Sequence, residues 1–181
     1  MKSLNFLTLF IIFIFACARS YIKTGNFSEK FNKELNYKVC ILPPVISPSD
    51  ILISNPLLFE RTYNKLITRF SEVKKFNLID KYVVMDLCKR HEFGQLGYID
   101  PVEGKEIATE LGADLVVICE LGASPPPGGG LPFYANVIII DVKSGETVYT
   151  GSGRCANPLS AEAGLELAIQ LATEKILKEM K

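Results

Sequence analysis

The spacing of hydrophobic and polar positions changes several times along the chain, and each spacing predicts a different element. Residues 114–121 read Asp-Leu-Val-Val-Ile-Cys-Glu-Leu, a short run that is apolar at nearly every position and rich in β-branched side chains. A strand with one face in water needs a polar residue at every second position, so this run predicts a strand covered on both faces. We expect it to be the central strand of the domain.

Further runs predict four more strands, at residues 37–42, 76–80, 131–142 and 147–155. The first of them ends at two prolines, which cannot extend a ladder of hydrogen bonds, and residues 45–54 then read as a loop. The last two flank the turn sequence Lys-Ser-Gly-Glu and predict a hairpin. In its return strand Gly151 and Gly153 share one face, which leaves room for a bulge, for the last helix or for a partner.

Apolar residues recur at helical spacing in four stretches: residues 56–74, 82–89, 101–111 and the region after Asn157-Pro158. Asn55-Pro56, Asp100-Pro101 and Asn157-Pro158 each place a capping side chain before a proline in the first turn. The last helix is expected to bury Leu165, Ala168, Ile169, Ala172 and Ile176. Two successive strand-helix-strand passages imply parallel neighbours. The prediction is an α/β fold, a two-layer sandwich with a mixed sheet of about five strands and about four helices.

The first residues follow another pattern. A short positive start precedes an almost continuous apolar run over residues 4–16. This run is shorter than the roughly 20 residues that cross a bilayer as a helix, so residues 1–16 predict a secretory signal peptide. Its end, Ile14-Phe15-Ala16-Cys17, resembles the bacterial lipobox and predicts lipid attachment at Cys17. A plain secretory signal with a chance cysteine, or an uncleaved anchor, are the alternatives.

A lipobox implies that Cys17 becomes the mature amino terminus and carries two or three acyl chains, enough for durable attachment to a membrane. Ala18 follows it rather than Asp, which by analogy with enteric bacteria favours the outer membrane. Residues 17–36 are polar and mixed and predict a tether with a span of about 25 Å before the folded domain, residues 37–181. Four large apolar side chains favour the alternative, a docked segment or short helix: Tyr21, Ile22, Phe27 and Phe31.

Composition and motifs give no sign of catalysis. With 20 basic and 20 acidic residues, the chain has no positive field that would gather nucleic acid. His91 is the single histidine and lies in a charged stretch, which favours a solvated loop over a catalytic role. Nucleophile elbows, phosphate loops and zinc spacings are missing, so we expect no cofactor, no metal and no enzyme activity. Scattered carboxylates leave a wall-modifying enzyme as an alternative.

Two further features stay open at this stage. Cys40, Cys88, Cys119 and Cys155 form an even set that permits disulfides, but two of them stand inside apolar strands and favour buried thiols. The loop between the predicted strands is rich in proline and glycine and is either a connection with no role or a contact surface. Its candidate partner contacts are Pro125, Pro126, Pro127, Leu131, Phe133 and Tyr134.

Residues 39–44, 76–81, 107–117 and 140–148 occur in an order that resembles a small α/β domain of bacterial envelope proteins. Three families share it: the curli-secretion channel lipoproteins, the lipoprotein activators of penicillin-binding proteins, and the Tol-system propeller protein in its amino-terminal domain. The resemblance implies a periplasm-facing adaptor or regulator in envelope assembly, secretion or cell-wall synthesis. It also implies an envelope protein partner, makes an oligomer possible and carries over no catalytic residue. A subunit of a secretion pore complex is the alternative.

Overall fold

The computed structural model describes residues 21–46, 56–93, 100–123, 132–156 and 160–180. The elements in chain order are β1 (Tyr21–Phe27), β2 (Tyr37–Ile41), β3 (Val45–Ile46), α2 (Pro56–Ser71), β4 (Phe76–Leu78), α3 (Lys81–Arg90), α4 (Pro101–Glu110), β5 (Leu115–Ala123), β6 (Pro132–Asp141), β7 (Thr147–Ala156) and α5 (Ala161–Met180).

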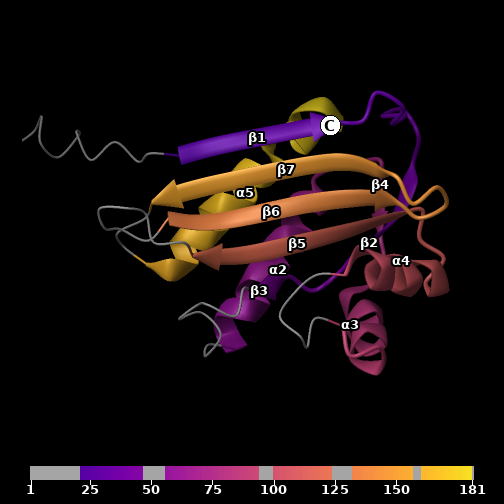
Figure 1. Cartoon of the computed structure of the whole chain (residues 1–181), viewed down its shortest axis with the longest axis horizontal. Coiled ribbons are helices and arrows are strands. Elements are labelled where there is room, and N and C mark those ends of the chain that lie inside the picture. Colours follow the sequence, from indigo (N-terminus) through magenta and orange to yellow (C-terminus); the bar gives the residue numbers. More distant parts are fainter. Residues whose placement is uncertain (1–20, 47–55, 94–99, 124–131, 157–159, 181) are drawn as a thin grey trace, which may run out of the picture.

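The strands form one seven-stranded sheet in the order β1-β7-β6-β5-β2-β4, with β3 paired to β5 off this path (Figure 1). β2 is parallel to both β4 and β5, and β3 is also parallel to β5. β5, β6, β7 and β1 pair antiparallel. All five predicted strands, their parallel neighbours and the hairpin are confirmed, and the fold is α/β with a mixed sheet. β1 and β3 are additional.

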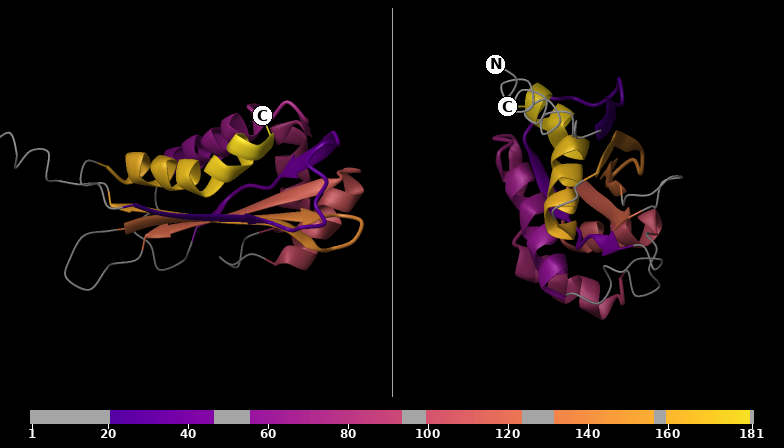
Figure 2. Two further views of the ribbon diagram at one scale, coloured as in Figure 1. Left: turned by 90° about the horizontal axis from the view of Figure 1, so that it is seen from above. Right: turned by 90° about the vertical axis from the view of Figure 1, so that its left-hand side faces the viewer.

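The core lies on both faces of β5, which confirms that this strand is covered on two sides. Leu115, Val117, Cys119 and Leu121 face a large cluster under α2 and α5, whereas Val116 and Ile118 face a second cluster with α3 and α4. Figure 2 shows α2 and α5 side by side against one face of the sheet. α3 and α4 reach the opposite face only near one end (Figure 1). The predicted two-layer sandwich therefore has a small additional layer.

The paired glycines of β7 make room for the last helix, one of the three alternatives left open by the sequence. A Cβ added at Gly153 would come 2.1 Å from the carbonyl oxygen of Ala168, and one at Gly151 would come 2.2 Å from that of Ala172. Tyr149 Oη donates a hydrogen bond of 2.7 Å to the same Ala172 oxygen. The backbones of β7 and α5 thus approach closely.

Residues 21–36 belong to the folded body, so over these residues the expected tether is corrected to the docked alternative, while residues 17–20 lie outside the described residues. β1 pairs with β7 along its whole length, from Tyr21 opposite Cys155 to Phe27 opposite Tyr149. Phe31 then stacks on the Phe27 ring with centroids 5.5 Å apart. The main-chain groups at the edge of β7 need hydrogen-bond partners, and the main chain of β1 supplies them whatever its side chains are. A polar segment can therefore form an edge strand, and its composition alone favours a tether.

Three smaller corrections concern loops and caps. Val45 and Ile46 form β3 inside the expected loop 45–54, a strand too short to show alternation. α5 begins at Ala161 and the Ser160 hydroxyl accepts from Ala163 N–H, so the cap expected at Asn157 is replaced by Ser160. The Asp100 cap is confirmed, since its carboxylate accepts from Val102 N–H. Asn55 lies outside the described residues.

Candidate functional site

The sheet has one half-face that no described helix covers. It is formed by β6, β7 and β1, and Figure 1 looks directly onto it, with α2 and α5 behind the strands. Alternation along each strand sends every second side chain to this side. We call this surface the open face. Its side chains are those of Tyr134, Asn136 and Ile138 on β6, Thr150, Ser152 and Arg154 on β7, Ile22, Thr24 and Asn26 on β1, and Glu120 at its border on β5.

Strand register arranges these side chains in cross-strand rows. One row contains Thr24, Ser152, Asn136 and Glu120, each opposite the next. Glu120 accepts hydrogen bonds from Tyr134 Oη at 3.3 Å and from Asn136 Nδ2 at 3.1 Å. Since directly opposed side chains in antiparallel strands lie about 5 Å apart, this row is a continuous polar band. The band can offer both donors and acceptors to a partner.

Tyr134 is held in place by the strand beside it. Its cross-strand partner is Gly122, and a Cβ added there would come within 2.5 Å of the Tyr134 ring. The glycine therefore allows the aromatic ring to lie across β5, where its hydroxyl reaches Glu120. A half-buried aromatic side chain fixed in this way loses little freedom when a partner binds.

The neighbouring row consists of Tyr134, Arg154 and Ile22, again opposite one another in register. Arg154 is exposed, and Ile22 is 66% exposed. Tyr21 follows on the other side of β1 and is 58% exposed. Here, aromatic, cationic and aliphatic groups meet at the edge of the polar band.

A groove of about 290 Å³ runs between β1 and the carboxyl-terminal half of α5. Its lining residues are Lys23, Thr24, Gly25, Leu171, Glu174, Lys175, Lys178 and Glu179. Lys23 Nζ lies 2.7 Å from a Glu174 oxygen and bridges the groove, and hydrogen bonding to Glu174 raises the pKa of Lys23. The groove is thus closed in part by an ion pair that also fixes β1 to α5.

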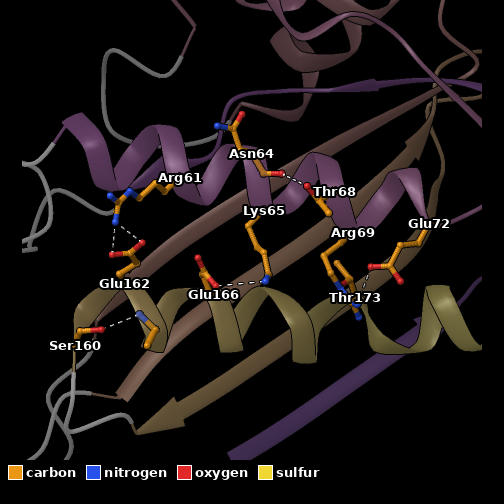
Figure 3. A network of polar contacts seen from close by, with 11 residues as sticks. Arg61, Asn64, Lys65, Thr68, Arg69, Glu72, Ser160, Glu162, Glu166 and Thr173 are labelled. Atoms are coloured by element: carbon orange, nitrogen blue, oxygen red, sulfur yellow. Dashed lines mark hydrogen bonds and ion pairs between the residues drawn. The ribbon is translucent and has the colours of Figure 1, made fainter.

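Figure 3 shows a second polar network, along the outer side of α2 and α5. Arg61 Nη1 lies 2.7 Å from Glu162, and Lys65 Nζ lies 3.3 Å from Glu166. Arg69 Nε donates to Thr173 Oγ1 at 3.3 Å. Because water screens exposed pairs of this kind, the network aligns the two helices more than it stabilises them. We assign it a structural role.

The structure places His91 beside a carboxylate, and the cysteine closest to it in sequence is Cys88. His91 Nε2 lies 3.1 Å from Glu110 Oε2, so the loop residue is paired rather than simply solvated. Cys88 is a nearby thiol in sequence, but burial raises its pKa to about 12, as it does for Cys40. A thiol with such a pKa is a poor nucleophile. Among the described residues, no group of three or more His, Cys, Asp or Glu could hold a metal.

All four predicted buried thiols are confirmed as free and buried: Cys40, Cys88, Cys119 and Cys155. In the part of the chain that the structure describes, no helix is both long and apolar enough to cross a membrane.

The predicted lipidation site, Cys17, and four of the six predicted partner contacts lie outside the described residues; these four are Pro125, Pro126, Pro127 and Leu131. Phe133 is 4% exposed and packs where Gly164 leaves space, so its side chain is not available as a surface anchor. Tyr134 is on the open face.

Sequence reasoning missed Glu120, Arg154 and Ile22 as members of this face. The alternation of Thr150, Ser152 and Arg154 with buried glycines was the signal that could have found Arg154.

Comparison with known proteins supports this description of the fold. A scan against protein-family models gives no match, and neither does a search of curated proteins. Among solved structures, the chain is similar to the PelC dodecamer from Paraburkholderia phytofirmans (TM-score 0.53, 10% identity, 89% of this chain and 98% of that chain). It is also similar to lipoprotein GNA1162 from Neisseria meningitidis (0.50, 16%, 78% and 98%). The LpoB C-terminal domain from Salmonella enterica gives 0.49 at 14% identity, over 72% and 88%.

The predicted resemblance is confirmed as a resemblance of fold. At 10 to 16% identity, these likenesses concern the arrangement of strands and helices. PelC and GNA1162 are each covered over 98% of their chains, so the shared fold includes nearly everything in those two structures.

Proposed function

We propose that this chain is a lipid-anchored, periplasm-facing module of the bacterial envelope that acts through protein contacts and not as an enzyme. The observation that carries the proposal is the open face, a half of the sheet that no helix of the described residues covers and that is lined by a fixed polar band. Sheets in compact domains usually bury their faces against another layer, so a face kept polar is suited to a partner that binds and leaves.

The contacts within the open face support recognition of a protein. Glu120 orients both Tyr134 and Asn136, and Gly122 fixes the position of the Tyr134 ring. A preorganised polar band that offers both donors and acceptors suits a protein interface, because groups that are already fixed lose little freedom on binding. The proposed role is that of an adaptor or regulator in envelope assembly, secretion or cell-wall synthesis.

Lipidation at Cys17 would provide the attachment. GNA1162, which shares the fold, is a lipoprotein, and the lipobox-like sequence before Cys17 would give this chain the same kind of anchor. Two or three acyl chains hold a protein at a membrane durably, whereas one does not. The outer membrane is the proposed location, since Ala18 rather than Asp follows the cysteine.

The test uses the full chain in its native envelope. A photo-crosslinking amino acid is placed at Thr150, an exposed residue of the open face, and in a second variant at Thr68, an exposed residue of α2. The proposal expects a discrete protein adduct from Thr150, none from Thr68, and loss of the Thr150 adduct when Cys17 is replaced by serine. Equal adducts at both positions, or none at Thr150, contradict the open face as the contact surface.

A further inference from the structure

One end of the sheet is defined by four strand termini. Tyr21, the first residue of β1, lies opposite Cys155 near the end of β7, and Cys155 lies opposite Phe133 near the start of β6. Phe133 in turn lies opposite Ala123, the last residue of β5. All four termini are at the left in Figure 1. We call this end of the domain the anchor end, because the chain from Cys17 joins it at Tyr21.

The chain segment between Cys17, the proposed lipid site, and the anchor end is short. Three residues separate Cys17 from Tyr21. A fully extended chain spans at most about 3.6 Å per residue, so the two Cα atoms lie within about 14 Å of each other. A flexible tether reaching to residue 36 would have allowed about 25 Å on average. The pairing of β1 with β7 removes that freedom and, given the lipid of the proposed function, brings the anchor end to the membrane surface.

Side chains at the anchor end have the chemistry of a membrane–water boundary. Tyr21 and Ile22 are 58% and 66% exposed, and Arg154 and Tyr134 continue the row from Ile22 across the open face. Tyrosine is enriched where headgroups meet acyl chains, and arginine is attracted to anionic lipid phosphates. One row further from the membrane, the cross-strand row is entirely polar, running from Thr24 to Glu120. Ile138, two rows further from this end, is half-buried against the second cluster, so among the described residues of the open face Ile22 is the large apolar side chain that is exposed.

The large apolar residues of the segment 21–36 differ in how far they pack on the folded body. Phe27 and Phe31 dock on the body, with the Phe27 ring 4.8 Å from that of Tyr149. Tyr21 and Ile22 remain exposed although they belong to the same short segment. Leu35 is 52% exposed as well, and of these three exposed residues Tyr21 and Ile22 are the two nearest Cys17.

We propose that the row of Ile22, Arg154 and Tyr134, together with Tyr21 beside it on the other side of β1, rests in the headgroup region of an anionic phospholipid membrane, and we call these four residues the bilayer-contact row. This inference rests on the proposed lipid anchor and adds an orientation to it. The strands point away from the bilayer, and the polar part of the open face, including Thr150, stands free in the periplasm for a protein partner.

The chain contains no tryptophan, so a single introduced tryptophan reports its own depth without background. Ile22→Trp and Asn26→Trp place it on the same face of the same exposed strand. The two positions differ by four residues, about 13 Å along β1. The lipidated full-length protein is incorporated into vesicles of phosphatidylglycerol and phosphatidylcholine with brominated acyl chains. We expect loss of fluorescence and a blue shift at position 22, and an unquenched, water-like spectrum at position 26.

The possible outcomes distinguish a failure of the proposed orientation from a failure of the proposed lipid anchor. If the protein fails to float with the vesicles and its mass shows an unmodified Cys17, the proposed function itself fails. If it floats but position 22 is unquenched, or both positions are quenched alike, the bilayer-contact row is refuted while the anchor stands. Replacing Arg154 by glutamine in the Ile22→Trp protein should weaken quenching in vesicles that contain phosphatidylglycerol. An unchanged signal there refutes the role of Arg154.

Discussion

The close approach of α5 to β7 gives the sharpest stability prediction. Gly153→Ala places a Cβ 2.1 Å from the Ala168 carbonyl oxygen and 2.7 Å from the Ala172 nitrogen, both main-chain atoms that cannot rotate away. The helix must therefore shift outwards by more than an ångström. Overpacking of this kind costs about 1–3 kcal/mol. The alanine regains at most about 1 kcal/mol, because glycine is unfavourable inside a strand.

Displacement of α5 also disturbs the hydrogen bond from Tyr149 Oη to the Ala172 oxygen, which contributes about 1 kcal/mol. We therefore expect Gly153→Ala to lower the free energy of unfolding by about 2 kcal/mol. For a domain of this size that corresponds to a fall in Tm of about 4–8 °C. Urea unfolding of the purified protein, followed by far-ultraviolet circular dichroism, measures the change.

The matched control is Ser152→Ala, which introduces the same residue between the two glycines but on the open face. It should stay within about 0.5 kcal/mol of the wild type. If Gly153→Ala is equally mild, the glycines do not serve the packing of α5, and the argument from close approach is wrong.

Three further predictions use buried or bridging groups. Tyr63→Phe removes the hydroxyl that donates a hydrogen bond of 2.7 Å to the Ile41 carbonyl and leaves that buried oxygen unsatisfied. Urea unfolding should therefore show that the free energy of unfolding falls by about 1–3 kcal/mol. An unchanged value would mean that water replaces the donor. The four thiols of the described residues should react with a disulfide reagent at pH 8 only after unfolding, and titration of just two would reveal a disulfide. Hydrogen bonds to lysines lower the pKa of Glu34 and of Glu179 below the usual 4.5, so these contacts stabilise the folded state above that pH and are lost as the pH falls through the lowered values. Hydrogen exchange between β1 and β2, corrected for its intrinsic rate, should therefore accelerate at pH 3 relative to β5, and equal protection at both pH values would contradict this.

Local patterns predicted the elements whose formation depends on neighbours in sequence. The β5 run, the β6–β7 hairpin and the Asp100 cap were all correct, because each needs only a few consecutive residues to define its hydrogen bonds or its burial. The apolar stripe of α5 was also correct, since helical spacing brings its residues to one side.

Long-range pairing decided the rest. β1 carries no alternating apolar pattern and is a strand because the edge of β7 supplies its hydrogen-bond partners. Its docking turns an expected tether into part of the sheet, which changes the distance from Cys17 to the domain.

The candidate site shows the same division. Phe133 and Tyr134 are adjacent aromatic residues, and the sequence treats them alike. Strand alternation sends them to opposite faces, and the packing of α5, with Gly164 against the Phe133 ring, places Phe133 in the core and leaves Tyr134 on the open face. Sequence by itself determined the fold class, the order of the main strands and helices, and the lipobox-like motif, because short-range spacing encodes them. Which surface stays open and how near it stands to the anchor follow from cross-strand register and helix contact, which join residues more than 100 positions apart in the chain.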